Sequence, residues 1–135
     1  MSQANVEIVR HIYEAVARGD AETVFSLYHD DVELDTSGLD DEAVLAGVFR
    51  GHEGLRQFFR EWGEAWEESD FELDELIAAG ERMVSVVTRH GRGRVSGIEV
   101  ESPGAVLWTI HEGKASRMVL FSTKADALEA VPGDL

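Results

Sequence analysis

The chain has 135 residues, of which 27 are Asp or Glu and 12 are Lys or Arg, and it contains no Cys. A chain of this length is expected to form one domain, spanning residues 1–135, and to bury a core without disulfides. The formal charge of −15 repels nucleic acid phosphates and anionic lipids, and the absence of Cys excludes thiolate metal sites and cysteine nucleophiles. Because the sequence shows neither a signal-like segment nor a long apolar run, we expect a cytoplasmic protein whose partners include no nucleic acid and no membrane.

The first third of the chain predicts helices followed by short strands. Apolar residues recur at helical spacing over residues 5–18, and Gly19 then favours the end of that helix. The carboxylate of Asp20 is suited to cap a second short helix. Alternation and turn residues predict, in order, a strand at 32–35, a loop at 36–42 and another short strand at 44–49.

The remainder predicts an aromatic-rich helix and then an antiparallel meander. Helical spacing returns over residues 51–66. Pro103 and Gly104 interrupt the third strand of the meander, and because proline cannot donate to a strand ladder, we expect a bulge or an edge position there. Turn residues divide this part into strands at 71–78, 83–95, 98–110 and 115–122, with a closing helix at 124–129.

The order of these elements resembles the SnoaL-like and ketosteroid-isomerase-like families, which share the cone-shaped fold of nuclear transport factor 2. The resemblance implies an α+β fold with three helices packed on the concave face of a curved, mainly antiparallel sheet. Residues 118–121 are apolar at consecutive positions, so both faces of that strand should be covered, and the convex face of the sheet is expected to form a homodimer. The strings that carry the resemblance lie at 19–20, 28–33, 49–56, 91–97, 106–114 and 125–130.

The resemblance predicts the fold but does not indicate which reaction, if any, is catalysed, since members of this fold include isomerases, cyclases, dehydratases and binding proteins. The general-base position of ketosteroid isomerase falls on Thr36, one residue after Asp35, and its oxyanion tyrosine falls on Ile12, beside Tyr13. The acids that such catalysts carry on the last two strands are missing. Asp35 is the best candidate for a general base, because it lies opposite Val32 and Leu34 on its strand, near the expected mouth of the cone. The alternative is that Asp35 ends a solvent-exposed strand.

His90 is the second catalytic candidate, and the sequence leaves its orientation open. It shares one face of a long strand with Arg92, whereas Ser85, Val87 and Arg89 occupy the other face. If the first series faces the cavity, His90 and Arg92 form a basic lip able to hold a carboxylate or phenolate. If it faces outward, both are rim or dimer-interface residues.

Aromatic side chains suggest an apolar pocket for a small apolar or aromatic molecule, although some of them are expected to be plain core. No histidine shows metal-ligand spacing, and the glycines at 91–97 lack a following helix, so we expect neither a metal nor any other cofactor. The candidates for ligand binding are Tyr13, Tyr28, Phe58, Trp62, Arg92 and Trp108.

Three functions remain open at this point. The first is a SnoaL-like small-molecule-binding protein, and the second is a proton-transfer enzyme of the polyketide cyclase, isomerase or dehydratase kind that uses Asp35 as its base and His90 or Tyr13 as its acid or oxyanion partner. The third is a structural dimerisation module with a filled core. Asp35 and His90 pointing into one cavity of at least ~300 Å³ would favour the first two functions.

Overall fold

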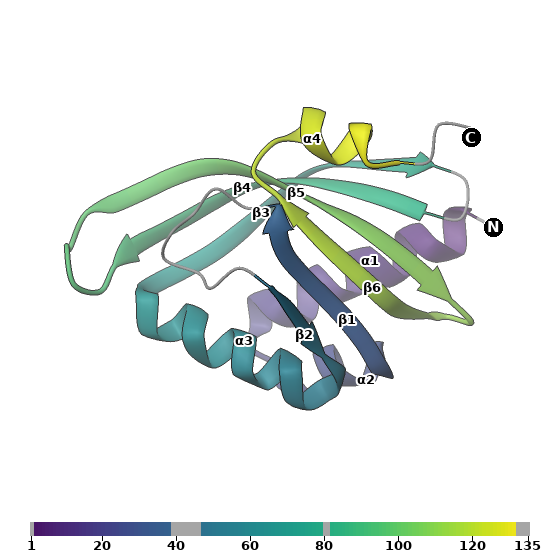
Figure 1. Ribbon diagram of the computed structural model, residues 1–135, viewed down its shortest axis with the longest axis horizontal. Coiled ribbons are helices and arrows are strands. Elements are labelled where there is room, and N and C mark those ends of the chain that lie inside the picture. The colour runs from purple at the N-terminus through teal and green to yellow at the C-terminus, as the bar shows by residue number, and fades with distance from the viewer. Residues whose placement is uncertain (1, 39–46, 80–81, 132–135) are drawn as a thin grey trace.

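Helices cover both faces of a six-stranded sheet in the computed structural model (Figure 1). The structure describes residues 2–38, 47–79 and 82–131. In chain order the elements are α1 (Ser2–Arg18), α2 (Ala21–Ser26), β1 (Tyr28–Gly38), β2 (Val48–Arg50), α3 (Gly51–Ala65), β3 (Trp66–Ala79), β4 (Arg82–Gly93), β5 (Glu99–His111), β6 (Lys114–Phe121) and α4 (Lys124–Glu129).

The strands follow the order β2-β1-β6-β5-β4-β3 across the sheet. β1 and β6 run parallel, and the other neighbouring strands are antiparallel. In Figure 1, α1, α2 and α3 lie on one side of the twisted sheet and α4 lies on the other. The predicted α+β fold, with three helices on one face of a mainly antiparallel sheet, is confirmed.

The boundary between α1 and α2 lies where the sequence predicted it. Gly19 has a φ of 70°, a conformation that favours glycine, and its N–H donates to the Val16 carbonyl at 3.0 Å. Asp20 then caps α2 by accepting a hydrogen bond from the Thr23 N–H at 3.2 Å. The core side of α1 holds residues that are at most 2% exposed, namely Val9, Ile12 and Ala15.

The strand β1 is longer than predicted. The sequence placed Thr36 in a loop, but Thr36 is 1% exposed and its N–H donates to the Gly47 carbonyl at 2.8 Å. The loop prediction is therefore wrong for residues 36–38, because alternation continues through polar residues that the sequence pattern reads as a turn. Residues 39–46, which include the first half of the second predicted strand, lie outside the described part of the chain.

The third predicted helix is confirmed to within one residue, but the strand after it begins five residues early. α3 ends at Ala65, and Trp66 already has the extended φ and ψ of −122° and 130°. The residues from 67 to 70 are polar and follow no alternation, so no local pattern indicates that they belong to β3.

Pro103 occupies the edge position that its chemistry requires. β5 pairs with β4 in register through Thr88 and Pro103, whereas its pairing with β6 reaches only as far as Ala105 and Phe121. β5 therefore extends beyond β6 at Pro103, where a missing N–H interrupts no ladder with β6.

Two hydrophobic clusters lie on opposite faces of the sheet. The larger one lies beneath α1, α2 and α3 and includes Met118, whereas the smaller one lies beneath α4 and includes Val84, Leu107 and Val119. The prediction that residues 118–121 are covered on both faces is confirmed in part: Met118 is buried, the other three residues are half-buried, and within the described residues α4 supplies part of the second cover. In the same residues, no helix has the length and apolar character that crossing a membrane requires.

Candidate functional site

A cavity of about 100 Å³ lies between the sheet and the helices α1 and α3. Its walls are apolar apart from a few side chains, and its volume exceeds the roughly 30 Å³ that one water occupies in the liquid. The core is thus not completely filled, yet the cavity is smaller than a drug-sized site. It is lined by Ile12, Tyr13, Val16, Tyr28, Leu34, Phe58, Phe59, Trp62, Phe71, Val87, Arg89, Gly104, Ala105, Val106, Trp108, Met118, Leu120 and Phe121.

A hydrogen-bonded group of three side chains lies at one end of this cavity, and two of its members, Tyr13 and Trp108, line the cavity. The Trp108 indole N–H donates to Ser85 Oγ at 2.8 Å, and the Tyr13 hydroxyl lies 2.8 Å from the same oxygen. Either hydroxyl can donate the hydrogen that joins the two. When Ser85 donates, the Tyr13 hydroxyl hydrogen is available to an acceptor in the cavity, which Tyr13 lines. Ser85 is completely buried, which holds the group rigidly against β4.

The side chain of Tyr28 places a second phenol at the same end of the cavity. Its ring stacks on Trp108 with centroids 6.5 Å apart, and its hydroxyl forms no hydrogen bond with a described residue. Burial raises the pKa of Tyr13 to about 12, although the hydrogen bonds with Ser85 and Trp108 oppose the shift. Burial and the neighbouring Tyr13 also raise the pKa of Tyr28. Both phenols are therefore protonated at neutral pH and are available as hydrogen-bond donors.

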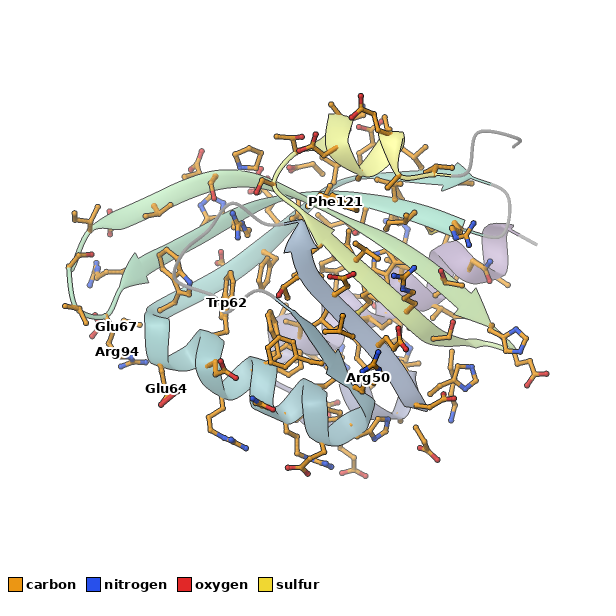
Figure 2. The ribbon with its side chains drawn as sticks, in the orientation of Figure 1. Arg50, Trp62, Glu64, Glu67, Arg94 and Phe121 are labelled. Atoms are coloured by element: carbon orange, nitrogen blue, oxygen red, sulfur yellow. The ribbon has the colours of Figure 1, made fainter. Side chains whose placement is uncertain are left out.

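Arg89 lies toward the other end of the cavity. Ser85, Val87 and Arg89 project from the same face of β4, and this face points toward the cavity. The guanidinium carbon of Arg89 lies 5.8 Å from the centre of the Trp62 ring, within the range of a cation–π contact. Figure 2 shows Trp62 reaching from α3 toward the sheet. Gly104 has no side chain, and a Cβ at that position would lie 3.4 Å from Arg89 Nε.

Five predicted ligand-binding residues line this one cavity, and the sixth does not. The sequence interpretation missed Arg89 as a lining residue, although the alternation through Ser85 and Val87 carried the signal. It also missed Phe71 and Phe121. The predicted residues at the cavity are Tyr13, Tyr28, Phe58, Trp62 and Trp108.

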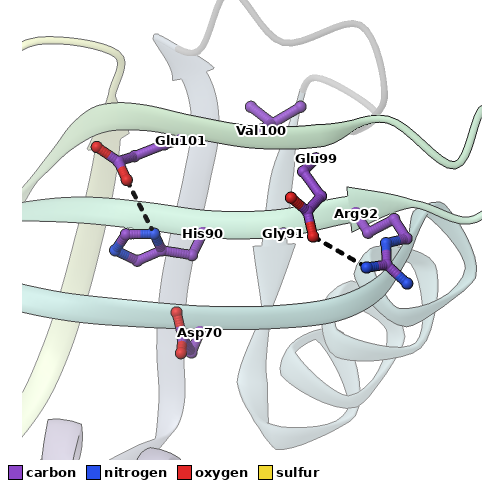
Figure 3. Close-up of a pocket in the computed structure, with 7 residues that line it drawn as sticks. All are labelled: Asp70, His90, Gly91, Arg92, Glu99, Val100 and Glu101. Atoms are coloured by element: carbon purple, nitrogen blue, oxygen red, sulfur yellow. Dashed lines mark hydrogen bonds and ion pairs between the residues drawn. The ribbon is translucent and has the colours of Figure 1, made fainter.

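His90 and Arg92 line another pocket, on the outer face of β4 (Figure 3), and neither lines the apolar cavity. His90 lies between two glutamates, with Nδ1 3.4 Å from Glu101 and Nε2 3.5 Å from Glu72. Arg92 donates to Glu99 at 2.9 Å. Of the two orientations that the sequence left open, the structure has the second, because the strand turns Val87 and Arg89 toward the cavity and His90 and Arg92 outward.

Asp35 also lies on the outer face. Leu34 and Thr36 are buried on the inner side of β1, so alternation turns the Asp35 side chain outward, where it lies 3.7 Å from an Arg117 nitrogen. Asp35 and His90 do not meet in one cavity, which corrects that expectation. Nor does any described group of three or more His, Cys, Asp or Glu residues have the arrangement needed to hold a metal ion.

Comparison with solved structures finds the same fold over almost the whole chain. TerC, co-crystallised with polyporic acid, is 24% identical, with 95% of this chain and 98% of that chain covered and a TM-score of 0.78. A nuclear transport factor 2-like protein of unknown function from Burkholderia pseudomallei is 26% identical, with 96% and 98% covered and a TM-score of 0.78. A Xanthomonas campestris protein provisionally named a polyketide cyclase is 18% identical, with 96% and 98% covered and a TM-score of 0.76.

The match to a protein-family model is more specific than the matches to solved structures. No curated protein matches the chain. The model of the SnoaL-like domain matches residues 9–118, which include α2, α3 and almost all of the sheet. The chain therefore belongs to the SnoaL-like family and has the fold of nuclear transport factor 2-like proteins.

Proposed function

We propose that this SnoaL-like protein binds a small, flat and mostly apolar molecule in the cavity between its sheet and helices. The observation that carries the proposal is the combination of apolar walls with two protonated phenols, Tyr13 and Tyr28, at one end. Apolar walls with a few fixed polar groups are typical of small-molecule sites. The phenols are suited to orient a carbonyl or hydroxyl oxygen of the ligand.

The size of the cavity limits the ligand. An apolar cavity of roughly 150 Å³ accepts a benzene ring, and the present one has about 100 Å³. A molecule with one aromatic ring therefore requires small shifts of the lining side chains, and one with two rings requires larger shifts. Phe59 and Trp62 are the lining residues best placed to move, because Phe59 is 38% exposed and Trp62 is only half-buried.

The alternative of a proton-transfer enzyme with Asp35 as its base has no support from this geometry. No described residue that lines the cavity carries a carboxylate. An enzyme built on this cavity would have to use Tyr13 or Tyr28 to stabilise an oxyanion while a group of the substrate or water took the proton. The alternative of a structural module with a filled core is also less favoured, since the cavity is lined by donors as well as by apolar groups.

We further propose a homodimer through the outer face of the sheet, with the cytoplasm as its compartment. Half-buried apolar side chains on that face, including Val86 and Val119, support the first point, and the absence of Cys supports the second. Light scattering at micromolar concentration should give twice the chain mass. A monomeric mass would contradict the dimer.

The binding proposal is tested with neutral ring compounds and a variant that fills the cavity. Benzamide and 2-naphthamide are titrated into ¹⁵N-labelled protein, and the Trp108 indole N–H resonance reports binding at the phenol end. We expect saturable shifts in the wild-type protein. Val87→Phe, which places a ring in the cavity, should weaken binding at least tenfold.

The matched control is Val86→Phe, because Val86 lies on the opposite face of the same strand. It should leave the affinity within about twofold of wild type. Saturable binding that persists in Val87→Phe would place the ligand elsewhere, and no binding of either amide would overturn the proposed function for ligands of this size.

A further inference from the structure

We propose that the ligand is a flat two-ring compound with a hydroxyl or carbonyl oxygen at each end, and that Trp66 and Ser102 bind the oxygen that lies farther from the two phenols. The inference rests on the proposed function, because it names the chemical class of the ligand for the same cavity. It adds a second polar subsite, which lies in a separate small pocket.

This small pocket adjoins the cavity at the end away from Ser85. It has a volume of about 30 Å³, and it shares Trp62 and Arg89 with the cavity as lining residues. Gly91 and Val100 face each other in register on β4 and β5, and both line the pocket. A glycine in a strand leaves room for the close approach of a ligand. The volume suits one water molecule or one oxygen of a ligand.

Trp66 lines this small pocket and has an unpaired donor. Its indole Nε1 is buried and forms no hydrogen bond with any described residue. The ring lies against Trp62, with centroids 5.9 Å apart. An indole N–H is a donor only, and buried donors are nearly always paired. An acceptor that occupies the small pocket would supply the missing partner.

Ser102 brings a second polar group to the same pocket from β5. It pairs in register with Arg89, and residues that pair directly project from the same face of the sheet. Ser102 is half-buried, and its hydroxyl forms no hydrogen bond with a described residue. Because a hydroxyl both donates and accepts, one ligand oxygen can accept from Trp66 and also share a hydrogen bond with Ser102.

The spacing along β4 fixes the distance between the two ligand oxygens. Ser85 and Arg89 are four residues apart on one face, so their Cα atoms are about 13 Å apart. Ser85 marks the end with the phenols, and Arg89 is level with Ser102. A hydrogen bond of ~2.8 Å at each end leaves roughly 7–8 Å between the oxygens. Oxygens at opposite ends of two fused rings are separated by about this distance.

An apolar group at the far end of the ligand would fit the small pocket less well. It would leave the Trp66 N–H buried without an acceptor, and such a group loses its hydration without a replacement. Sites that hydrogen-bond a ligand oxygen reject the analogue that lacks it for this reason. The small pocket should therefore discriminate between a hydroxyl and a methyl group of similar size.

The test uses three naphthamides that are uncharged at pH 7. The compounds are 6-hydroxy-2-naphthamide, 6-methyl-2-naphthamide and 2-naphthamide, and each is titrated into ¹⁵N-labelled protein. We expect the hydroxy compound to bind at least tenfold more tightly than the methyl compound. All three should shift the Trp108 indole N–H resonance, and the hydroxy compound should shift that of Trp66 more than the methyl compound does.

Two variants locate this preference in the small pocket. Trp66→Phe keeps an aromatic ring but removes the indole N–H, and Ser102→Ala removes the hydroxyl. Each should lower the preference for the hydroxy over the methyl compound at least threefold. The control is Thr88→Val, which removes a hydroxyl from the outer face of β4, where it bonds Asp74, and it should leave the preference unchanged.

The outcomes separate the inference from the proposed function. Binding of 2-naphthamide with no gain from the hydroxyl group would overturn the inference and leave the binding function standing; the small pocket would then hold only water. A preference that survives in both Trp66→Phe and Ser102→Ala would also overturn it. Failure of all three compounds to bind would overturn both proposals. If Trp66→Phe does not fold, the wild-type preference and Ser102→Ala still decide the question.

Discussion

The Trp108 indole N–H donates to the hydroxyl of Ser85 at 2.8 Å, across the pair of strands β4 and β5, and both residues are at most 2% exposed. The same hydroxyl is also hydrogen-bonded to Tyr13 of α1. A single serine thus connects a helix and two strands at one end of the cavity. This buried polar group is stable only while every member keeps a partner.

Replacing Ser85 with Ala should therefore lower the free energy of unfolding by more than the removal of one small side chain normally does. The Trp108 N–H would remain buried without an acceptor, and we expect the free energy of unfolding to fall by roughly 2–3 kcal/mol. Urea unfolding followed by circular dichroism measures the change. Ser116→Ala is the control, since its hydroxyl bonds the Thr109 carbonyl at a partly exposed position, and it should cost less than about 1 kcal/mol. Equal losses in the two variants would contradict the importance of the buried group.

The raised pKa of Tyr13 predicts a loss of stability in alkali. Because the folded pKa is about 12 against a usual value of 10.0, the unfolded chain loses this proton first as the pH rises. The stabilisation is complete below pH ~10 and disappears between about pH 10 and 12, with an upper limit of roughly 3 kcal/mol. Tyr13→Phe should be less stable than wild type at pH 8 by about 1 kcal/mol, because it lacks the hydrogen bond to Ser85.

The difference in the free energy of unfolding between wild type and Tyr13→Phe should shrink or reverse by pH 11. Urea unfolding at pH 8, 10 and 11 gives the comparison. Parallel pH profiles for wild type and Tyr13→Phe would show that Tyr13 titrates in the folded protein as it does in the unfolded chain.

Two glycines of α3 should respond in opposite directions to the same substitution. A Cβ on Gly54 would lie 2.8 Å from the backbone carbonyl carbon of Phe49, whereas a Cβ on Gly63 would have no neighbour within 4 Å. We expect Gly54→Ala to destabilise the protein by about 1–3 kcal/mol through overpacking. Gly63→Ala should stabilise it by roughly 0.5–1 kcal/mol, since alanine favours a helix. Thermal unfolding of both variants tests the close approach of α3 and β2.

The variant Asp35→Asn tests whether Asp35 lies outside the binding site. Because the Asp35 side chain lies near Arg117 and is 17% exposed, its charge contributes to an ion pair outside the binding site. We expect a loss of stability of at most about 1 kcal/mol and a ligand affinity within twofold of wild type. Arg117→Gln should cause a similar small loss of stability. A large fall in affinity in Asp35→Asn would restore Asp35 as a site residue.

The helices show how much the sequence pattern could predict. Periodicity together with Gly19 placed the end of α1 correctly, and the aromatic spacing placed α3 to within one residue. Local chemistry decides these features, because a glycine or a capping carboxylate acts on its immediate neighbours. The early start of β3 at Trp66 escaped prediction because strand pairing with Gly93, far along the chain, holds the polar segment extended.

The candidate site shows where the pattern was insufficient. Alternation in β4 separated Arg89 from His90 and Arg92, but both series begin with apolar residues, since Val84 packs beneath α4 and Val87 lines the cavity. A strand covered on both faces has no polar face to mark the outside. The sequence therefore left two equivalent choices, and the site residues depended on which one the fold adopts.

The sequence by itself determined the family, the order of helices and strands and the pairs of residues that share a strand face, because these follow from local spacing and chemistry. The tertiary structure decided which face lines the cavity. Packing of α1 and α3 on one side of the sheet and of α4 on the other turned Tyr13, Ser85 and Arg89 inward and placed Asp35 and His90 outside. That choice depends on contacts between residues far apart in the chain, which no local pattern contains.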